Sequence, residues 1–142
     1  MALALVAVLV ASPMMLTTRA SNADLNGAHW ARNTSPFTLR VSANLTGKWR
    51  KHATRAARDW SKSGVVKMRV VNSRGGNRRV CQPRNGQVEL CNAKFGENGW
   101  LGLSRIWIDS NNHIVKASIT LNDTYFNQAP YNKAKARQHT MC

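Results

Sequence analysis

The sequence predicts an α+β domain of about five strands, with one amphipathic helix after the first strand and the start of a second helix at the C-terminus. Three observations lead to this fold class. Several short segments alternate apolar and polar residues, which is the period of a half-buried strand. One longer segment repeats its apolar residues at helical spacing instead. Turns rich in Gly and Asn separate the segments and mark them as distinct elements.

The first strand is expected at 37–41, where the sequence Phe-Thr-Leu-Arg-Val alternates strictly. Residues 21–35 before it are polar and read as an extended lead-in anchored by Trp30. A helix is expected at 47–63, with Thr46 as its N-cap and Gly64 as its end. The apolar residues that share the helix face expected to be buried are Trp49, Ala53, Ala56, Ala57 and Trp60.

The opposite face of this helix is basic. Its cations are Lys51, Arg55, Arg58 and Lys62. They either contact the phosphates of a polyanion or form the solvated side of the helix, where neighbouring like charges cost ~0.2–0.5 kcal/mol per pair. Both tryptophans of the helix lie on the other face, so no aromatic side chain is interleaved with the cations. This arrangement favours the solvated side.

The rest of the chain predicts four strands and a helix start. The strands are expected at 65–71, 87–90, 102–108 and 114–121. The turn pair Asn85-Gly86 leads into the second of them, and the polar residues at 109–112 separate the last two. A basic helix begins at Tyr131 and has no stop signal before Cys142, so we expect it to continue past this residue.

The apolar run at the N-terminus predicts a secretory signal peptide at 1–20, because it ends in the small-residue site Thr18-Arg19-Ala20. A membrane anchor or a wrongly assigned start remains an alternative. Cleavage would leave a lead-in up to residue 27 and a single domain at 28–142. We therefore expect an extracellular protein without stable membrane association.

The net charge of +15 favours polyanionic surroundings such as nucleic acid, anionic lipid or acidic wall polymers. Against this, the cations are scattered along the chain, and secreted proteins are also basic for solubility alone. A small basic polyanion-binding protein is therefore the second functional hypothesis.

Three cysteines are present. In an oxidising compartment Cys81 and Cys91 would close a short loop, worth ~2–3 kcal/mol in the chain-entropy model. Cys142 is then left over, and either a partner downstream of this chain or a free thiol accounts for it.

The sequence contains few candidates for catalysis. The histidines are His29, His52, His113 and His139, and no pair has the spacing of metal ligands on a helix. No two of the six acidic residues form a close pair suited to acid–base chemistry. His139 either occupies a surface position or approaches a site beyond the end of its helix. No metal ligand and no catalytic residue is therefore assigned in this chain.

Several short segments, taken in order and spacing, resemble a group of secreted bacterial zinc metallopeptidases that look like metzincins, the class that includes the matrix metalloproteinases. The segments are His29–Arg32, Asp59–Ser63, Asn85–Asn92, Asn98–Ile108, Leu121–Phe126 and Met141-Cys142. The resemblance covers nearly all of 28–142.

This resemblance implies the N-terminal half of a metzincin-like domain, which is a twisted mixed sheet with a helix after its first strand. In the family an active-site helix with H-E-x-x-H-x-x-G-x-x-H follows, whose histidines hold zinc and whose Glu is the general base. By resemblance, 131–142 leads into that helix and the chain is truncated before the zinc motif. The implied function of a complete family member is zinc-dependent hydrolysis of peptide bonds. By the resemblance, this chain lacks the zinc ligands and the general base, so we expect it to bind no zinc and to be inactive alone.

The resemblance also implies a substrate site. In metzincins the antiparallel edge strand binds the peptide or protein substrate as an added strand. The segment Gly102-Leu103-Ser104 resembles the Gly-Leu-Ala stretch that does this in matrix metalloproteinases, and Arg105 continues it. The alternative is an ordinary core strand in which Ile106 and Trp107 are packed.

Overall fold

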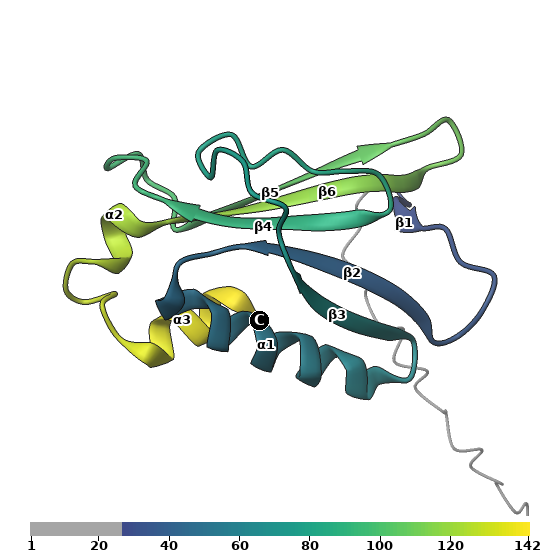
Figure 1. The fold of residues 1–142 in the computed structure, drawn as a ribbon, viewed down its shortest axis with the longest axis horizontal. Helices are drawn as coiled ribbons and strands as arrows, with labels where there is room; N and C mark the ends of the chain where they lie inside the picture. Colours follow the sequence, from purple (N-terminus) through teal and green to yellow (C-terminus); the bar gives the residue numbers. More distant parts are fainter. Residues whose placement is uncertain (1–26) are drawn as a thin grey trace, which may run out of the picture.

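The computed structural model describes residues 27–142. A twisted sheet carries its helices on one side, and a long loop crosses the other side (Figure 1). The predicted signal peptide at 1–20 and the start of the predicted lead-in lie outside the described residues.

The strands are β1 (His29–Trp30), β2 (Phe37–Asn44), β3 (Val66–Asn72), β4 (Gln87–Ala93), β5 (Gly102–Ile108) and β6 (His113–Asn122). The helices are α1 (Gly47–Trp60), the 3-10 turn η1 (Ser61–Ser63), α2 (Asp123–Phe126) and α3 (Ala134–Met141). The five predicted strands are all present, and β5 has the predicted bounds. The short strand β1 is the addition, and it arises because Trp30 of the lead-in pairs with Ile114.

The sheet is mostly parallel, with the order β1-β6-β4-β2-β3. Among the strands of residues 27–142, β5 alone runs antiparallel, against β6. Ile114 of β6 pairs with Trp30 on one side and Ile108 on the other, so β1 and β5 lie on opposite sides of β6. In the described part of the chain β5 is therefore the outermost strand at its side of the sheet. The prediction of a mixed α+β domain is confirmed at this level.

One face of the sheet is covered by α1 and α3 and holds the core. Its residues alternate along the strands and include Leu39, Val41, Val88, Leu90, Ala117 and Leu121. Trp49 of α1 is 1% exposed and packs edge-on against Phe126, with 4.7 Å between ring centroids. Its Nε1 donates to Asp123 Oδ1 at 2.8 Å, so the largest side chain of the core has its polar atom satisfied.

Two buried asparagines connect the sheet to its surroundings. The side chain of Asn92 accepts from the Thr46 amide at 2.8 Å and so holds the start of α1. Asn122 accepts from the amides of Phe95 and Thr124 and donates to the carbonyl of Gly96 at 2.8 Å. Both are 0% exposed. These bonds fix the loop before β5 and the helix after β6.

The predicted helices differ from the structure in several details. Thr46 occupies the N-cap position of α1, but its side chain makes no capping hydrogen bond. The chain turns into the 3-10 turn η1 at Ser61 instead of remaining α-helical to Ser63. Trp60 was expected on the buried face but is 50% exposed. It lies in the last turn of α1, where it lines an open hollow together with Cys142 and is not covered by the sheet or by α3. The last helix begins at Ala134 rather than Tyr131, because Tyr131 is held in a turn and contacts the rings of Tyr125 and Phe126.

The other face of the sheet is crossed by the loop between β3 and β4. Cys81 in this loop forms a disulfide with Cys91 of β4, as predicted. Cys142 is exposed and is not in a disulfide. No helix within residues 27–142 is long and apolar enough to cross a membrane.

Candidate functional site

The predicted substrate strand lies at the edge of the sheet. All four residues assigned to it, Gly102, Leu103, Ser104 and Arg105, belong to β5. They pair in regular antiparallel register with β6, from Gly102 opposite Leu121 to Arg105 opposite Ser118. The opposite edge of β5 has no strand partner among the described residues. Its main-chain groups on that side are therefore open to a further strand.

The second half of β5 is unusually apolar for an exposed strand. Ile106, Trp107 and Ile108 are 39%, 38% and 49% exposed. The alternative that Ile106 and Trp107 are ordinary packed core residues does not account for this exposure. Trp107 lies under the ammonium group of Lys116, 5.3 Å from the ring centroid. A register shift between Trp107 and Ile108 ends the regular part of the strand.

The turn after β5 is fixed by one carboxylate. Asp109 Oδ1 accepts from the amides of Asn111 and His113, both at 2.9 Å. The two backbone donors, first that of His113, hold the pKa of this carboxyl below its ordinary value. Asn112 takes a positive φ of 59°, as such a turn requires. The hairpin that presents β5 is thus closed by local polar contacts.

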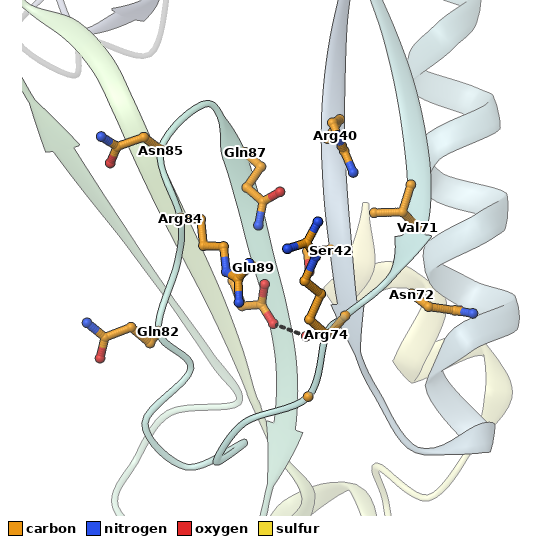
Figure 2. Close-up of a pocket in the computed structure, with 12 residues that line it drawn as sticks. Arg40, Ser42, Val71, Asn72, Arg74, Gln82, Arg84, Asn85, Gln87 and Glu89 are labelled. Carbon is orange, nitrogen blue, oxygen red and sulfur yellow. Dashed lines mark hydrogen bonds between the residues drawn. The ribbon is translucent and has the colours of Figure 1, made fainter.

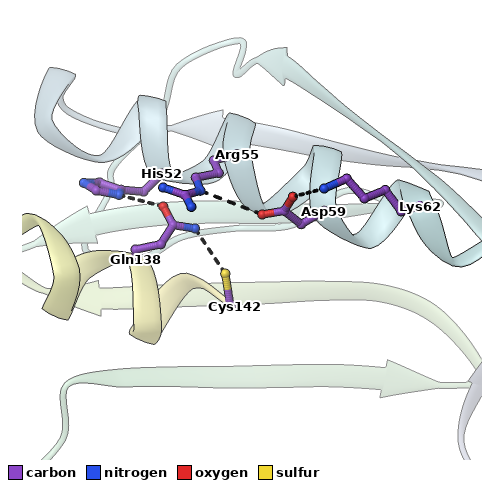
Figure 3. Close-up of polar contacts among 6 residues, drawn as sticks. All are labelled: His52, Arg55, Asp59, Lys62, Gln138 and Cys142. Atoms are coloured by element: carbon purple, nitrogen blue, oxygen red, sulfur yellow. Dashed lines mark hydrogen bonds and ion pairs between the residues drawn. The ribbon is translucent and has the colours of Figure 1, made fainter.

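The basic face of α1 is exposed along its whole length, but part of its charge is balanced. Figure 3 shows Asp59 between Arg55 and Lys62. Lys62 Nζ lies 2.9 Å and Arg55 Nε 3.9 Å from the carboxylate. The hydrogen bond from Lys62 is the main cause that lowers the pKa of Asp59. Lys51 and Arg58 have no such partner in the described chain, so the predicted polyanion contact would rest mainly on these two.

The four histidines form two separate pairs. His29 and His113 pack edge-on, with 5.0 Å between ring centroids, and His113 Nδ1 lies 3.5 Å from Asp109 Oδ2. His52 and His139 line one hollow between α1 and α3. His52 of α1 is buried, and its Nδ1 lies 2.9 Å from Gln138 Oε1 of α3, which joins the two helices (Figure 3). His139 is exposed and lines a hollow of about 480 Å³ with Lys51 and Lys135. No group of three or more potential metal ligands occurs within residues 27–142. Gln138 also donates to Cys142 Sγ at 3.1 Å.

A second cationic surface, which was not predicted from the sequence, lies on the face of the sheet opposite the helices. Arg40 of β2 pairs in register with Arg69 of β3, and Thr38 with Lys67. Side chains paired in parallel register point to the same face, and all three cations are exposed. The sequence does contain a signal for this surface. The three cations occupy the polar positions of two alternating strands, and a helix connects these strands, which favours parallel pairing with the cations on one face.

Comparison with known proteins gives no relative. The chain matches no protein-family model, and neither curated proteins nor solved structures give a match.

Proposed function

We propose that this domain binds an extended peptide as an added strand along β5, as in the metzincin-like zinc endopeptidases that the sequence resembles. The main support is the combination of features in β5. It is the antiparallel strand of an otherwise parallel sheet, it is outermost on its side, and its last three residues expose apolar side chains. A bound strand would gain affinity from main-chain hydrogen bonds and specificity from alternate side chains.

The regular part of β5, from Gly102 to Arg105, is the segment proposed to receive the peptide. Exposed edges are commonly protected against pairing by bulges and charges. In β5 the register shift lies near the far end, after Trp107. The one charged side chain, Arg105, belongs to the alternating set that also contains Leu103 and Trp107, so it points out of the sheet plane and leaves the main chain accessible.

The proposal extends to zinc-dependent peptide-bond hydrolysis only for a complete family member. Zinc there would be held by three histidines and would activate water for attack on the scissile carbonyl. The residues described here do not fit such a site, since no three potential ligands lie together. The printed sequence also lacks H-E-x-x-H. We therefore assign to these residues the peptide-binding part of a secreted domain and no step of cleavage.

The test compares two series of capped peptides of the length of β5, seven residues. One series is unmodified, and the other carries single N-methyl groups along the backbone. In an added strand only alternate N–H groups face the sheet. Methylation at one alternating set of positions should weaken binding roughly two- to tenfold per site, because each methyl removes one hydrogen bond. Methylation at the other set should change affinity little.

Amide hydrogen exchange locates the bound peptide. We expect slower exchange at the outward amides of β5 and no change in β3, the strand at the other side of the sheet. The fluorescence of Trp107 supplies a second signal, with Trp107→Phe to assign it. Binding that is insensitive to the position of the methyl group, or the absence of binding by every peptide in a diverse series, would refute the proposal.

A further inference from the structure

A polar hollow lies on the face of the sheet that carries no helix. It has a volume of about 340 Å³ and is bordered by β2, the end of β3, β4 and the loop that joins β3 to β4. Three arginines line it, Arg40 from β2 and Arg74 and Arg84 from the two ends of the loop. Figure 2 shows Arg74 and Arg84 extending into the hollow from opposite sides. A volume of this order suits a small ligand or one end of a larger one.

The three guanidinium groups are not used by the fold. All three arginines are exposed. The ion pairs found within residues 27–142 all involve Asp59 or Asp109, which lie elsewhere. Each guanidinium offers five N–H donors in a planar fork that matches the oxygens of a phosphate or carboxylate. The amides of Gln87 and Asn85 add further polar groups to the lining.

One carboxylate, that of Glu89, borders the same hollow. It is 5% exposed, and its Oε1 accepts from the Ser73 hydroxyl at 2.8 Å. One negative charge beside three positive charges leaves the hollow with a net positive charge. The positive charge extends beyond the hollow, because Arg69 lies next to Arg40 in register. A structural role as counter-ions of Glu89 would need one arginine and does not explain three.

We propose that this hollow binds a tetrahedral oxyanion, either phosphate or sulfate, through Arg40, Arg74 and Arg84. The ligand group is free inorganic anion or the same group carried on an organic molecule. The site lies on β2, the end of β3, β4 and the loop that joins β3 to β4 rather than on β5, so it is independent of the proposed peptide-binding edge. It is also distinct from the basic face of α1, which lies on the other side of the sheet.

The experiment is an NMR titration of the uniformly ¹⁵N-labelled chain that follows backbone amides and arginine side-chain N–H groups. Sodium phosphate and sodium sulfate are the two probes, and sodium chloride at the same ionic strength is the reference. We expect saturable shifts at Arg40, Arg74, Arg84 and the loop between β3 and β4 with at least one probe. Replacing Arg74 or Arg84 by Gln should weaken binding roughly tenfold or more, since hydrogen bonds to charged groups are among the stronger ones.

The variant Glu89→Gln separates the proposal from a purely structural role. It keeps the shape of the side chain and removes the one negative charge, so the oxyanion should bind more tightly. The matched control is Arg55→Gln with Arg58→Gln, which removes the same kind of charge from α1 and should leave the affinity unchanged. If Glu89→Gln does not fold, the two arginine variants still decide the question.

Three results would overturn the proposal. Chloride at matched ionic strength could produce the same shifts, or Arg74→Gln and Arg84→Gln could retain full affinity. The shifts could also fall on α1 instead of the hollow. Failure of peptide binding at β5 has no bearing on this outcome, because the two surfaces share no residue.

Discussion

The two faces of the sheet differ in almost every property, although the same strands supply both. On the helix-covered face, β2 contributes Leu39, Val41 and Ala43, all buried. On the opposite face the same strand contributes Thr38 and Arg40, both exposed. The alternation of a single strand thus places apolar side chains on one face of the sheet and polar ones on the other. The covered face buries the apolar core, and the other face carries exposed cations and is held to its crossing loop by the Cys81–Cys91 disulfide.

The largest expected effect is the loss of Trp49 on the covered face. Trp49→Ala should lower the free energy of unfolding by ~3–5 kcal/mol, because it empties a fully packed position and leaves Asp123 without its indole donor. The matched control is Trp60→Ala, the same substitution at the half-exposed end of α1. It should cost under ~1 kcal/mol. Urea denaturation of both variants measures the difference, and equal losses would contradict the assignment of the core.

The next effect concerns the one covalent link on the opposite face. Replacing Cys81 and Cys91 together by Ala should lower the free energy of unfolding by ~2–3 kcal/mol, because the loop is no longer closed in the unfolded chain. Cys142→Ala is the control and should leave stability nearly unchanged, since that thiol is exposed and is not in a disulfide. A reducing agent should destabilise the native protein and have no effect on the double variant. Stability that is insensitive to reduction would contradict this.

A smaller effect, of opposite sign, is expected for the cations of the open face. Arg40 and Arg69 lie opposite each other in parallel register, and like charges so placed repel. Replacing both by Gln should raise the free energy of unfolding by up to ~0.5 kcal/mol, with a larger gain at low ionic strength. Denaturation at two salt concentrations measures this. A loss above ~1 kcal/mol would show that this face also supports the fold.

The smallest effect belongs to the turn that joins β5 and β6 and is seen through pH. The pKa of Asp109 is lower in the folded chain than in the unfolded one, because the amides of His113 and Asn111 donate to its carboxylate. The folded state is therefore favoured above the unfolded pKa, and this contribution is lost as the pH falls through the folded pKa. Asp109→Asn should remove this contribution, so stability should fall slightly near neutral pH and change little at the acid end, which flattens the acid side of the stability profile. Asp59 acts in the same direction and must be kept as in the wild type during the comparison.

The elements of the fold were predictable because their signals are local. The alternation of Phe37 to Val41 and the helical spacing of Trp49 and Ala53 are readable within a few residues. The exposure of Trp60 was not, because it depends on where α1 ends relative to α3. Strand order was not readable from local signals either, since β2 pairs with β4 across the whole of α1 and β3.

The candidate sites divide in the same way. The edge segment at Gly102 was located through a resemblance, and the register with β6 then accounts for its accessibility. The polar hollow was not predicted from the sequence, because Arg40, Arg74 and Arg84 come from separate segments of the chain. Only parallel pairing and the disulfide-held loop bring them together. Scattered charge in a sequence is therefore weak support for scattered charge in space.

The burial of Asn122 has a consequence for producing this protein in a eukaryotic host. Asn122-Asp123-Thr124 is an acceptor sequence for N-glycosylation, as are the two that start at Asn33 and Asn44. Asn33 is exposed, whereas Asn122 is 0% exposed and its amide nitrogen donates to Gly96. A glycan transferred to Asn122 before folding would displace these bonds and block the native packing. Secreted material should therefore carry sugar at Asn33 and none at Asn122, while chains modified at Asn122 should be retained and degraded.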